Sequence, residues 1–187
     1  MITYTQAHSI DDLNGILALQ KKNLARGLSP EEIQSQGFVT VDHTFEQMKN
    51  LNDYEKHVIA KDDDKVVAYV LAMTKQSRHD IPILIPMFTI FDEIIFKGKK
   101  VCEYNYLVVG QVCVGKEYRG QGIFDGCYAA YQNFYQHRYD FAITEIATSN
   151  MRSLQAHKRI GFQNIHEYTS PDGVKWMVVA WDWKKPD

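Results

Sequence analysis

The chain has 187 residues, of which 45% are hydrophobic and 24% charged, with a formal net charge of −2 and a pI of about 6.4. These values are typical of one soluble domain with a real core, and the lack of a basic excess disfavours a nucleic-acid-binding protein held by phosphate contacts. Three cysteines without paired spacing give neither a metal site nor a disulfide framework, so we expect a reducing, cytoplasmic environment.

The first part of the chain predicts a strand, three helices and a hairpin. Residues 1–5 alternate weakly as a strand does, and apolar side chains recur at helical spacing in residues 11–24. Serine followed by proline and two acids begins a second helix at Ser29, and residues 44–51 form a third. Two β-rich runs around a polar turn predict a hairpin of residues 57–60 and 66–72.

Residues 81–91 are the most apolar stretch, but they are too few to span a bilayer. The N-terminus has neither the basic start nor the apolar run of a signal peptide. We therefore expect no association with a membrane. Pro82 and Pro86 interrupt the stretch, so residues 81–96 are expected to form a loop and a short helix.

The last part of the chain alternates strands with helices. The predicted strands and helices, in chain order, are residues 104–114, 122–138, 141–147 and 150–160, followed by a hairpin of 162–168 and 175–183. This order predicts a fold of the α/β (α+β) class, with a mixed, mostly antiparallel central sheet flanked by helices. We expect one domain over residues 1–187.

The loop between the strand 104–114 and the following helix has the features of an anion site. It carries Arg119, Gly120 and Gly122 immediately before the helix. Free N–H groups at a helix N-terminus attract anions, and glycines allow a diphosphate to approach the main chain. Neither common nucleotide motif fits, because Gly122 is not followed by Lys-Ser/Thr and Asp125 stands where the third glycine of a dinucleotide fingerprint belongs. Alone, the two glycines are better explained as a tight strand-to-helix turn.

A second motif stands at a characteristic distance from this loop. Asn150 is placed to cap a helix of about three turns, which stops at Gly161-Phe162. With Arg-Gly-x-Gly followed at this separation by Asn-x-x-Ser and Gly-Phe, residues 104–183 resemble the GNAT superfamily of acetyl-CoA-dependent N-acetyltransferases.

The resemblance implies that this region binds acetyl-CoA as a co-substrate. The main chain of Cys113 and Val114 would pair with the pantetheine arm, and Asn150 would contact the cofactor near its sulfur. The pyrophosphate would be held by N–H groups of the loop, that is, of Arg119, Gly120, Gln121, Gly122, Ile123 and Phe124. Relatives often have glycine or alanine at the position of Phe124, and we expect its ring to turn into the core.

The resemblance also implies the catalytic groups. His157 occupies a position at which many relatives have a tyrosine that protonates the departing thiolate, and an imidazolium with a pKa near 6.5 is a competent acid. The alternative is a helix residue packed beside the cofactor. Glu103 and Glu145 are candidates for a general base or are structural carboxylates. A covalent mechanism through Cys113 is disfavoured because no neighbour in the sequence lowers its pKa.

The expected function is N-acetyl transfer to a primary amine by direct attack in a ternary complex. The near-neutral charge favours a small-molecule acceptor, and we expect residues 81–96 to wall its pocket. Two alternatives remain: a CoA-binding sensor or interaction module without turnover, and a purely structural domain. Homodimers are common among proteins of this family, and nothing in the sequence decides for or against one here.

Overall fold

A mixed seven-stranded sheet organises the protein, in the order β1-β2-β3-β6-β7-β9-β8. The structure is a computed structural model that describes residues 1–36 and 38–184. All neighbouring strands are antiparallel except β6 and β7, as expected for the predicted fold class. The strands are β1 (Ile2–Gln6), β2 (Val58–Asp62), β3 (Lys65–Met73), β6 (Tyr106–Val114), β7 (Phe141–Ala147), β8 (Gln163–Thr169) and β9 (Lys175–Asp182), with a separate pair β4 (Ile95–Phe96) and β5 (Lys99–Lys100).

The predicted helices are confirmed to within a few residues. Ser9 and Thr44 each close a capping box, with Asp12 and Gln47 three residues on, which explains where the first and third helices begin. No helix in the described ranges is both long and apolar enough to cross a membrane. The helices are α1 (Ile10–Lys22), α2 (Pro30–Gln36), α3 (Phe45–Tyr54), α4 (Ile85–Glu93), α5 (Ile123–Tyr135) and α6 (Met151–Ile160).

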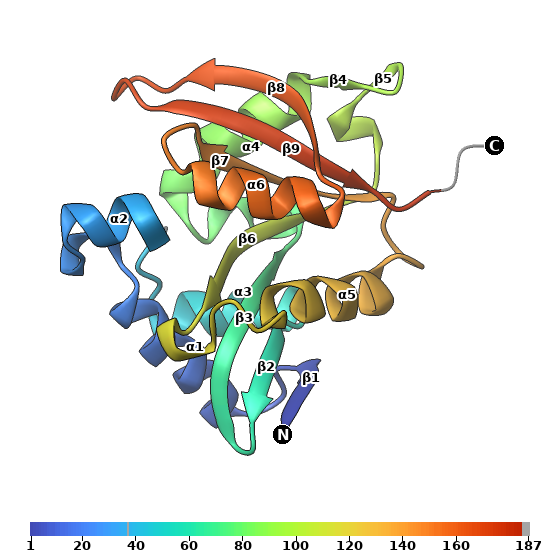
Figure 1. Cartoon of the computed structure of the whole chain (residues 1–187). Coiled ribbons are helices and arrows are strands. Elements are labelled where there is room, and N and C mark those ends of the chain that lie inside the picture. The colour runs from blue at the N-terminus through green and yellow to red at the C-terminus, as the bar shows by residue number, and fades with distance from the viewer. Residues whose placement is uncertain (37, 185–187) are drawn as a thin grey trace.

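The helices cover both faces of the sheet (Figure 1), and alternate strand residues supply the two cores. Leu107 and Val109 of β6 point into the core beneath α5 and α6. Tyr106 and Val108 point to the opposite face, where α4 packs, and α1 and α3 cover the N-terminal half of that face. This alternation follows from the two-residue repeat of a strand.

The sheet opens between β6 and β7. The two parallel strands pair only from Tyr106 to Val108, and beyond this point the Thr144 hydroxyl donates to the carbonyl of Val109 at 2.8 Å. A bulge at Gly110 and Gln111 interrupts the pairing of β6 with β3 in the same place. The C-terminal ends of β6 and β7 therefore diverge, and they lead directly into the loops before α5 and α6.

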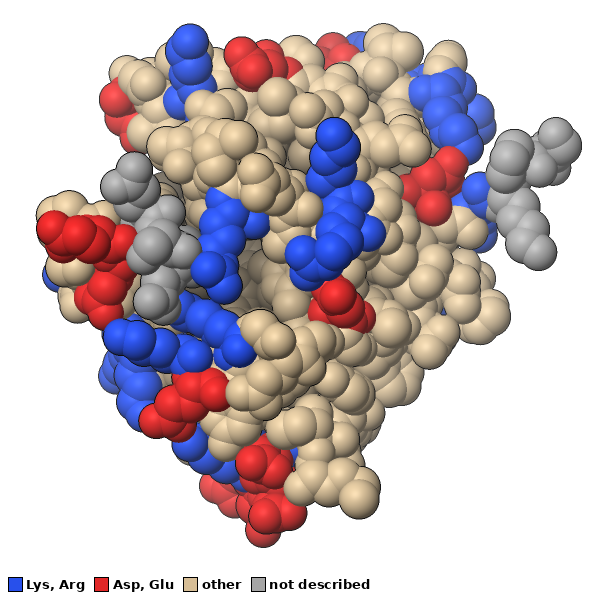
Figure 2. Space-filling model, in the orientation of Figure 1, with Lys and Arg blue, Asp and Glu red and all other residues tan. Residues whose placement is uncertain are grey.

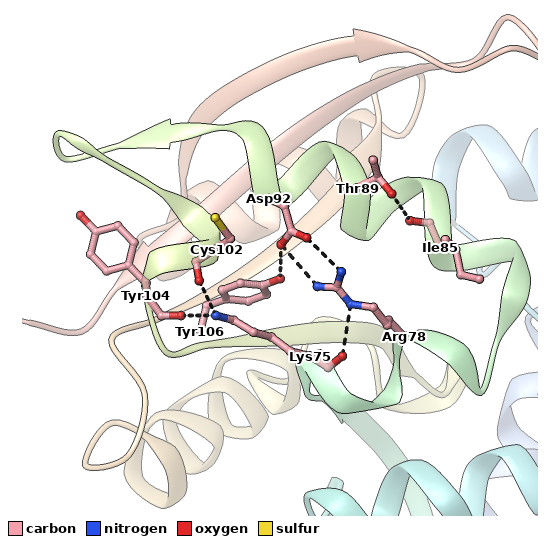
Figure 3. Close-up of polar contacts among 8 residues, drawn as sticks. All are labelled: Lys75, Arg78, Ile85, Thr89, Asp92, Cys102, Tyr104 and Tyr106. Carbon is pink, nitrogen blue, oxygen red and sulfur yellow. Dashed lines mark hydrogen bonds and ion pairs between the residues drawn. The ribbon is translucent and has the colours of Figure 1, made fainter.

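Residues 81–96 form a loop and a short helix, as predicted, followed by β4; an ion pair with Arg78 and a hydrogen bond from Tyr106 of β6 hold the helix at Asp92 (Figure 3). The Arg78 guanidinium binds both carboxylate oxygens of Asp92 at 2.9 and 3.3 Å, and the Tyr106 hydroxyl donates to the same carboxylate at 3.4 Å. The Lys75 ammonium donates to the carbonyls of Cys102 and Tyr104 at 2.8 and 2.5 Å. The segment thus closes the face of the sheet opposite α5 and α6.

Candidate active site

A pocket of about 520 Å³ lies between the end of β6 and the helices α5 and α6. We call it the larger pocket, to distinguish it from a smaller pocket beside it. Lys and Arg side chains gather around a hollow in this face of the molecule (Figure 2). The side chain of Gln121 is directed elsewhere and donates to the carbonyl of Glu117 at 2.8 Å, so Gln121 does not line the pocket. The other predicted cofactor-binding residues all line it: Cys113, Val114, Arg119, Gly120, Gly122, Ile123, Phe124 and Asn150.

The loop before α5 has the backbone conformation that a phosphate site needs. Gly120 and Gly122 have φ of 74° and 77°, and no heavy atom lies within 4 Å of where a Cβ would stand on either. The first helical N–H groups of α5 have no partner within the helix, and pairing starts where Gly126 donates to the carbonyl of Gly122. A diphosphate fits this cradle because backbone donors and open space coincide.

Three arginines line the larger pocket, and two of them also fix its walls. The Arg119 guanidinium donates to the carbonyl of Val114 at 3.0 Å and to Asn23 Oδ1 at 2.6 Å, which ties the loop to the end of α1. Arg159 pairs with Asp125 across the pocket at 2.8 Å. Arg152 is the third. Such a set of guanidinium groups suits phosphate oxygens.

Phe124 turns inward, as the sequence analysis expected. Its ring centroid lies 5.0 Å from that of Tyr128 and 5.4 Å from that of His157. The thiol of Cys113 is buried, and burial raises its pKa to about 12, so the thiol stays protonated at neutral pH. This agrees with the expectation that Cys113 is not a nucleophile.

His157 is buried behind the larger pocket, with both ring nitrogens in hydrogen bonds. Nδ1 lies 2.8 Å from the carbonyl of Ser153, which can only accept, so Nδ1 carries the proton and Nε2 accepts from the Tyr128 hydroxyl at 2.6 Å. Burial lowers the pKa of His157 to about 4, so the ring is neutral at neutral pH rather than the imidazolium that the resemblance implied. The role of general acid stays a prediction.

A second pocket, of about 100 Å³ and here called the smaller pocket, adjoins the larger one. It occupies the gap between β6 and β7, and Asn150 and Ser153 line both pockets. Phe38 and Val39, from the segment after α2, also line both. A thioester held in the larger pocket would therefore lie next to any molecule that binds in the smaller pocket.

Glu145 lines the smaller pocket and has an unusual environment. Burial raises the pKa of its carboxyl to about 7, while a hydrogen bond from the Tyr168 hydroxyl acts in the opposite direction. A carboxylate with such a pKa can accept a proton near neutral pH. Glu103, the other candidate base, lies in an exposed turn and accepts from the Lys100 N–H at 2.8 Å, and it lines neither pocket.

Gln111 holds one wall of the smaller pocket, and sequence reasoning missed it. Its Nε2 donates to the carbonyl of Val41 at 3.0 Å, while its Oε1 accepts from Gln20 at 2.7 Å and from the Tyr69 hydroxyl at 2.6 Å. These bonds hold the segment that carries Phe38 against the bulge in β6. A glutamine in the middle of an apolar strand was the only signal in the sequence.

None of residues 81–96 lines either pocket. They pack on the face of the sheet that carries Ile143 and Val178. That they wall the acceptor pocket stays a prediction. Among the described residues, no group of three His, Cys, Asp or Glu side chains is placed to hold a metal ion.

Comparisons with known proteins show the same fold. No curated protein sequence matches the chain. Among solved structures, the Escherichia coli ribosomal-protein-S18-alanine N-acetyltransferase is similar over 100% of this chain and 97% of its own, with a TM-score of 0.65 and 12% identity. An acetyltransferase of the GNAT family from Streptococcus agalactiae gives 0.67 and 12%, over 98% and 96% of the chains. A chain of the NatC complex bound to Gag peptide and CoA gives 0.64 and 12%, over 97% and 98%.

At these identities the solved structures show a shared fold. The sequence itself matches the family model described as the acetyltransferase (GNAT) family over residues 23–162, which include the loop before α5 and the whole of α6. The chain therefore belongs to the GNAT family of acetyltransferases.

Proposed function

We propose that this protein transfers an acetyl group from acetyl-CoA to the primary amine of a small molecule. The observation that carries the proposal is Glu145, whose carboxyl has a pKa of about 7 and lines a small pocket that opens onto the larger one. A binding module without turnover has no need of a buried carboxyl in this place.

The larger pocket is the proposed site of acetyl-CoA. The cradle at Gly120 and Gly122 and the arginines around it fit the pyrophosphate and the 3′-phosphate. The main chain at Cys113 and Val114, where β6 separates from β7, remains the proposed partner of the pantetheine arm. Asn150 stands where the two pockets meet, so it is the proposed neighbour of the thioester.

In the proposed reaction the amine nitrogen attacks the thioester carbon, the carbon–sulfur bond breaks and CoA leaves as a thiolate. Glu145 accepts the proton that the amine loses, directly or through one water molecule. The smaller pocket holds the amine beside the thioester, and such placement contributes much of the rate enhancement in direct attack.

His157 stays the proposed catalytic residue for the departing thiolate. Because the ring is neutral, it keeps its Nδ1–H and supports the Ser153 hydroxyl, which lies 3.3 Å from that nitrogen and donates a hydrogen bond to the thiolate until solvent supplies the proton. Ser153 lines both pockets, so its hydroxyl is the group through which His157 would act. A neutral imidazole is a weak acid, and a thiolate needs little help to leave, so we expect a small contribution.

The test compares Glu145→Gln with the unmodified protein in acetyl-CoA binding and in amine-dependent release of thiol. We expect unchanged acetyl-CoA affinity and a kcat that falls at least about 100-fold, because a general base typically contributes at least that factor. In the unmodified protein, activity should rise with pH through about 7, as the carboxyl loses its proton. Glu167→Gln, which alters an exposed carboxylate on β8, is the matched control and should retain activity.

Two other results would count against the proposal. Acetyl-CoA binding without thiol release across a broad amine panel would favour a sensor or interaction module. No binding of acetyl-CoA would remove the transferase function altogether.

A further inference from the structure

The smaller pocket contains charge of one sign. Among its lining residues in the described part of the chain, Glu145 is the only one that is charged near neutral pH, because His157 is neutral there. No lysine or arginine is among them. The rest of the lining is uncharged and mixed: Phe38, Val109 and Trp176 are apolar or aromatic, whereas other lining residues, such as Thr144 and Ser153, are polar.

The positive charges nearby belong to the larger pocket. Arg119, Arg152 and Arg159 line that pocket and none of them lines the smaller one. Arg119 is bonded to Val114 and Asn23, and Arg159 is paired with Asp125. An anionic group brought into the smaller pocket would therefore meet no cation among the described lining residues.

This arrangement discriminates between amines by the charge of the substituent on the carbon atom next to the nitrogen. An α-amino acid has its carboxylate two bonds from the nitrogen, so placing the amine beside Glu145 brings two negative charges together in a partly desolvated space. Such a pair is unfavourable both by Coulomb repulsion and by the loss of hydration. An amine whose neighbouring carbon has no ionised substituent, or has an uncharged amide in place of the carboxylate, brings no such charge.

The size of the smaller pocket limits what can enter it. About 100 Å³ corresponds to roughly three water molecules, so only the amino end of an acceptor fits inside. The rest of the acceptor would extend out of the pocket, and the lining residues Phe38 and Trp176, which are half-buried, offer it aromatic surface.

We propose that the acceptor is a primary amine with no carboxylate on the carbon beside the nitrogen and with an apolar or aromatic flank that packs on Phe38 and Trp176. This inference rests on the proposed function and deepens it. It defines the substrate class by exclusion of free α-amino acids.

The test uses three probes with the same aromatic flank: phenylalanine, its isosteric amide phenylalaninamide, and phenethylamine, which lacks the carboxyl group. With acetyl-CoA saturating, kcat/KM for the amide and for phenethylamine should exceed that for phenylalanine by about 100-fold, the scale of leaving one partly buried charge without a partner. In Glu145→Gln all rates fall, but the ratio between phenethylamine and phenylalanine should shrink, because the repelling charge is gone. Glu167→Gln should keep the ratio.

Equal use of phenylalanine and its amide would overturn the inference. Preference for the amide over phenethylamine would assign the acceptor to peptide N-termini, and the reverse to small amines; both support the inference, since neither carries the carboxylate. If no probe releases thiol, the Tm of the CoA-bound protein separates the two proposals. A Tm raised by phenethylamine and not by phenylalanine would reject the transferase function and support the selectivity, whereas equal effects of the two, or no effect of either, would reject the selectivity.

Discussion

The larger and the smaller pocket meet at Asn150 and Ser153, yet they are assembled from the sequence in different ways. Most of the larger pocket comes from two continuous segments, residues 112–125 and 150–159. The smaller pocket takes its lining from places as far apart as Phe38 and Trp176. The first depends on local backbone conformation and the second on how separate elements pack. Substitutions should therefore affect the two pockets separately.

The largest effect on the larger pocket alone is expected from Gly122→Val. A side chain there stands in the space that the pyrophosphate would occupy, and the loss of two backbone hydrogen bonds to a charged group lowers acetyl-CoA affinity by about 100-fold or more. Calorimetric titration measures this. Gly173→Val is the matched control, because Gly173 also has a positive φ, of 84°, and open surroundings, but lies in the β8–β9 turn. Equal loss of affinity in both variants would show that backbone strain, and not the cradle, is responsible.

The smaller pocket alone should respond to Gln111→Leu. Without the amide, the carbonyl of Val41 loses this hydrogen bond, although the main chain of Val39 stays bonded to Asn23 and Ala25. The segment that carries Phe38 is then held less firmly beside β6, and we expect KM for the amine to rise about 30-fold, on the scale of one or two lost hydrogen bonds. Acetyl-CoA affinity should change by far less. Steady-state kinetics with each substrate varied separates the two effects.

Tyr69→Phe is the control for this change. It removes one of the hydrogen bonds that Gln111 accepts but leaves the bond to Val41 in place, so it should lower stability without raising KM for the amine. A similar rise in KM in both variants would mean that general loosening of β6, and not the position of the segment, sets amine affinity.

This contrast also explains what could be predicted from the sequence. The loop at Gly120 and Gly122 and the cap at Asn150 depend on residues that are close together in the sequence, so the residue types alone predict them. The partner of Glu145 is Tyr168, which reaches it across β9 from an exposed edge strand, and no local pattern links the two. The sequence does not show which face of the sheet residues 81–96 cover, because both faces are apolar and apolarity alone does not choose between them.

A smaller effect is expected from His157→Phe, because His157 lies beside Ser153, which lines both pockets. If the neutral ring supports the Ser153 hydroxyl as a hydrogen-bond donor to the thiolate, kcat should fall about tenfold, below the usual range for a general acid, with KM for acetyl-CoA little changed. Tyr128→Phe is the matched control, since it removes the same hydrogen bond and leaves the imidazole in place. Unchanged kcat in His157→Phe would make His157 a packing residue, and equal falls in both variants would point to their shared hydrogen bond.

The smallest effect should come from Tyr168→Phe, which alters the base without touching either substrate site. The Tyr168 hydroxyl donates to Glu145 and stabilises its ionised form, so its loss raises the pKa of the carboxyl further above its usual range. The rise of kcat/KM with pH should then move to higher pH. At pH 7, where about half of the carboxyl is ionised in the unmodified protein, activity should fall about two- to threefold, and it should recover at pH 9. Recovery at high pH is the decisive feature, because a variant that merely misplaces Glu145 would stay slow at every pH. A pH profile that does not move would show that another group, and not Glu145, controls the rise of kcat/KM with pH.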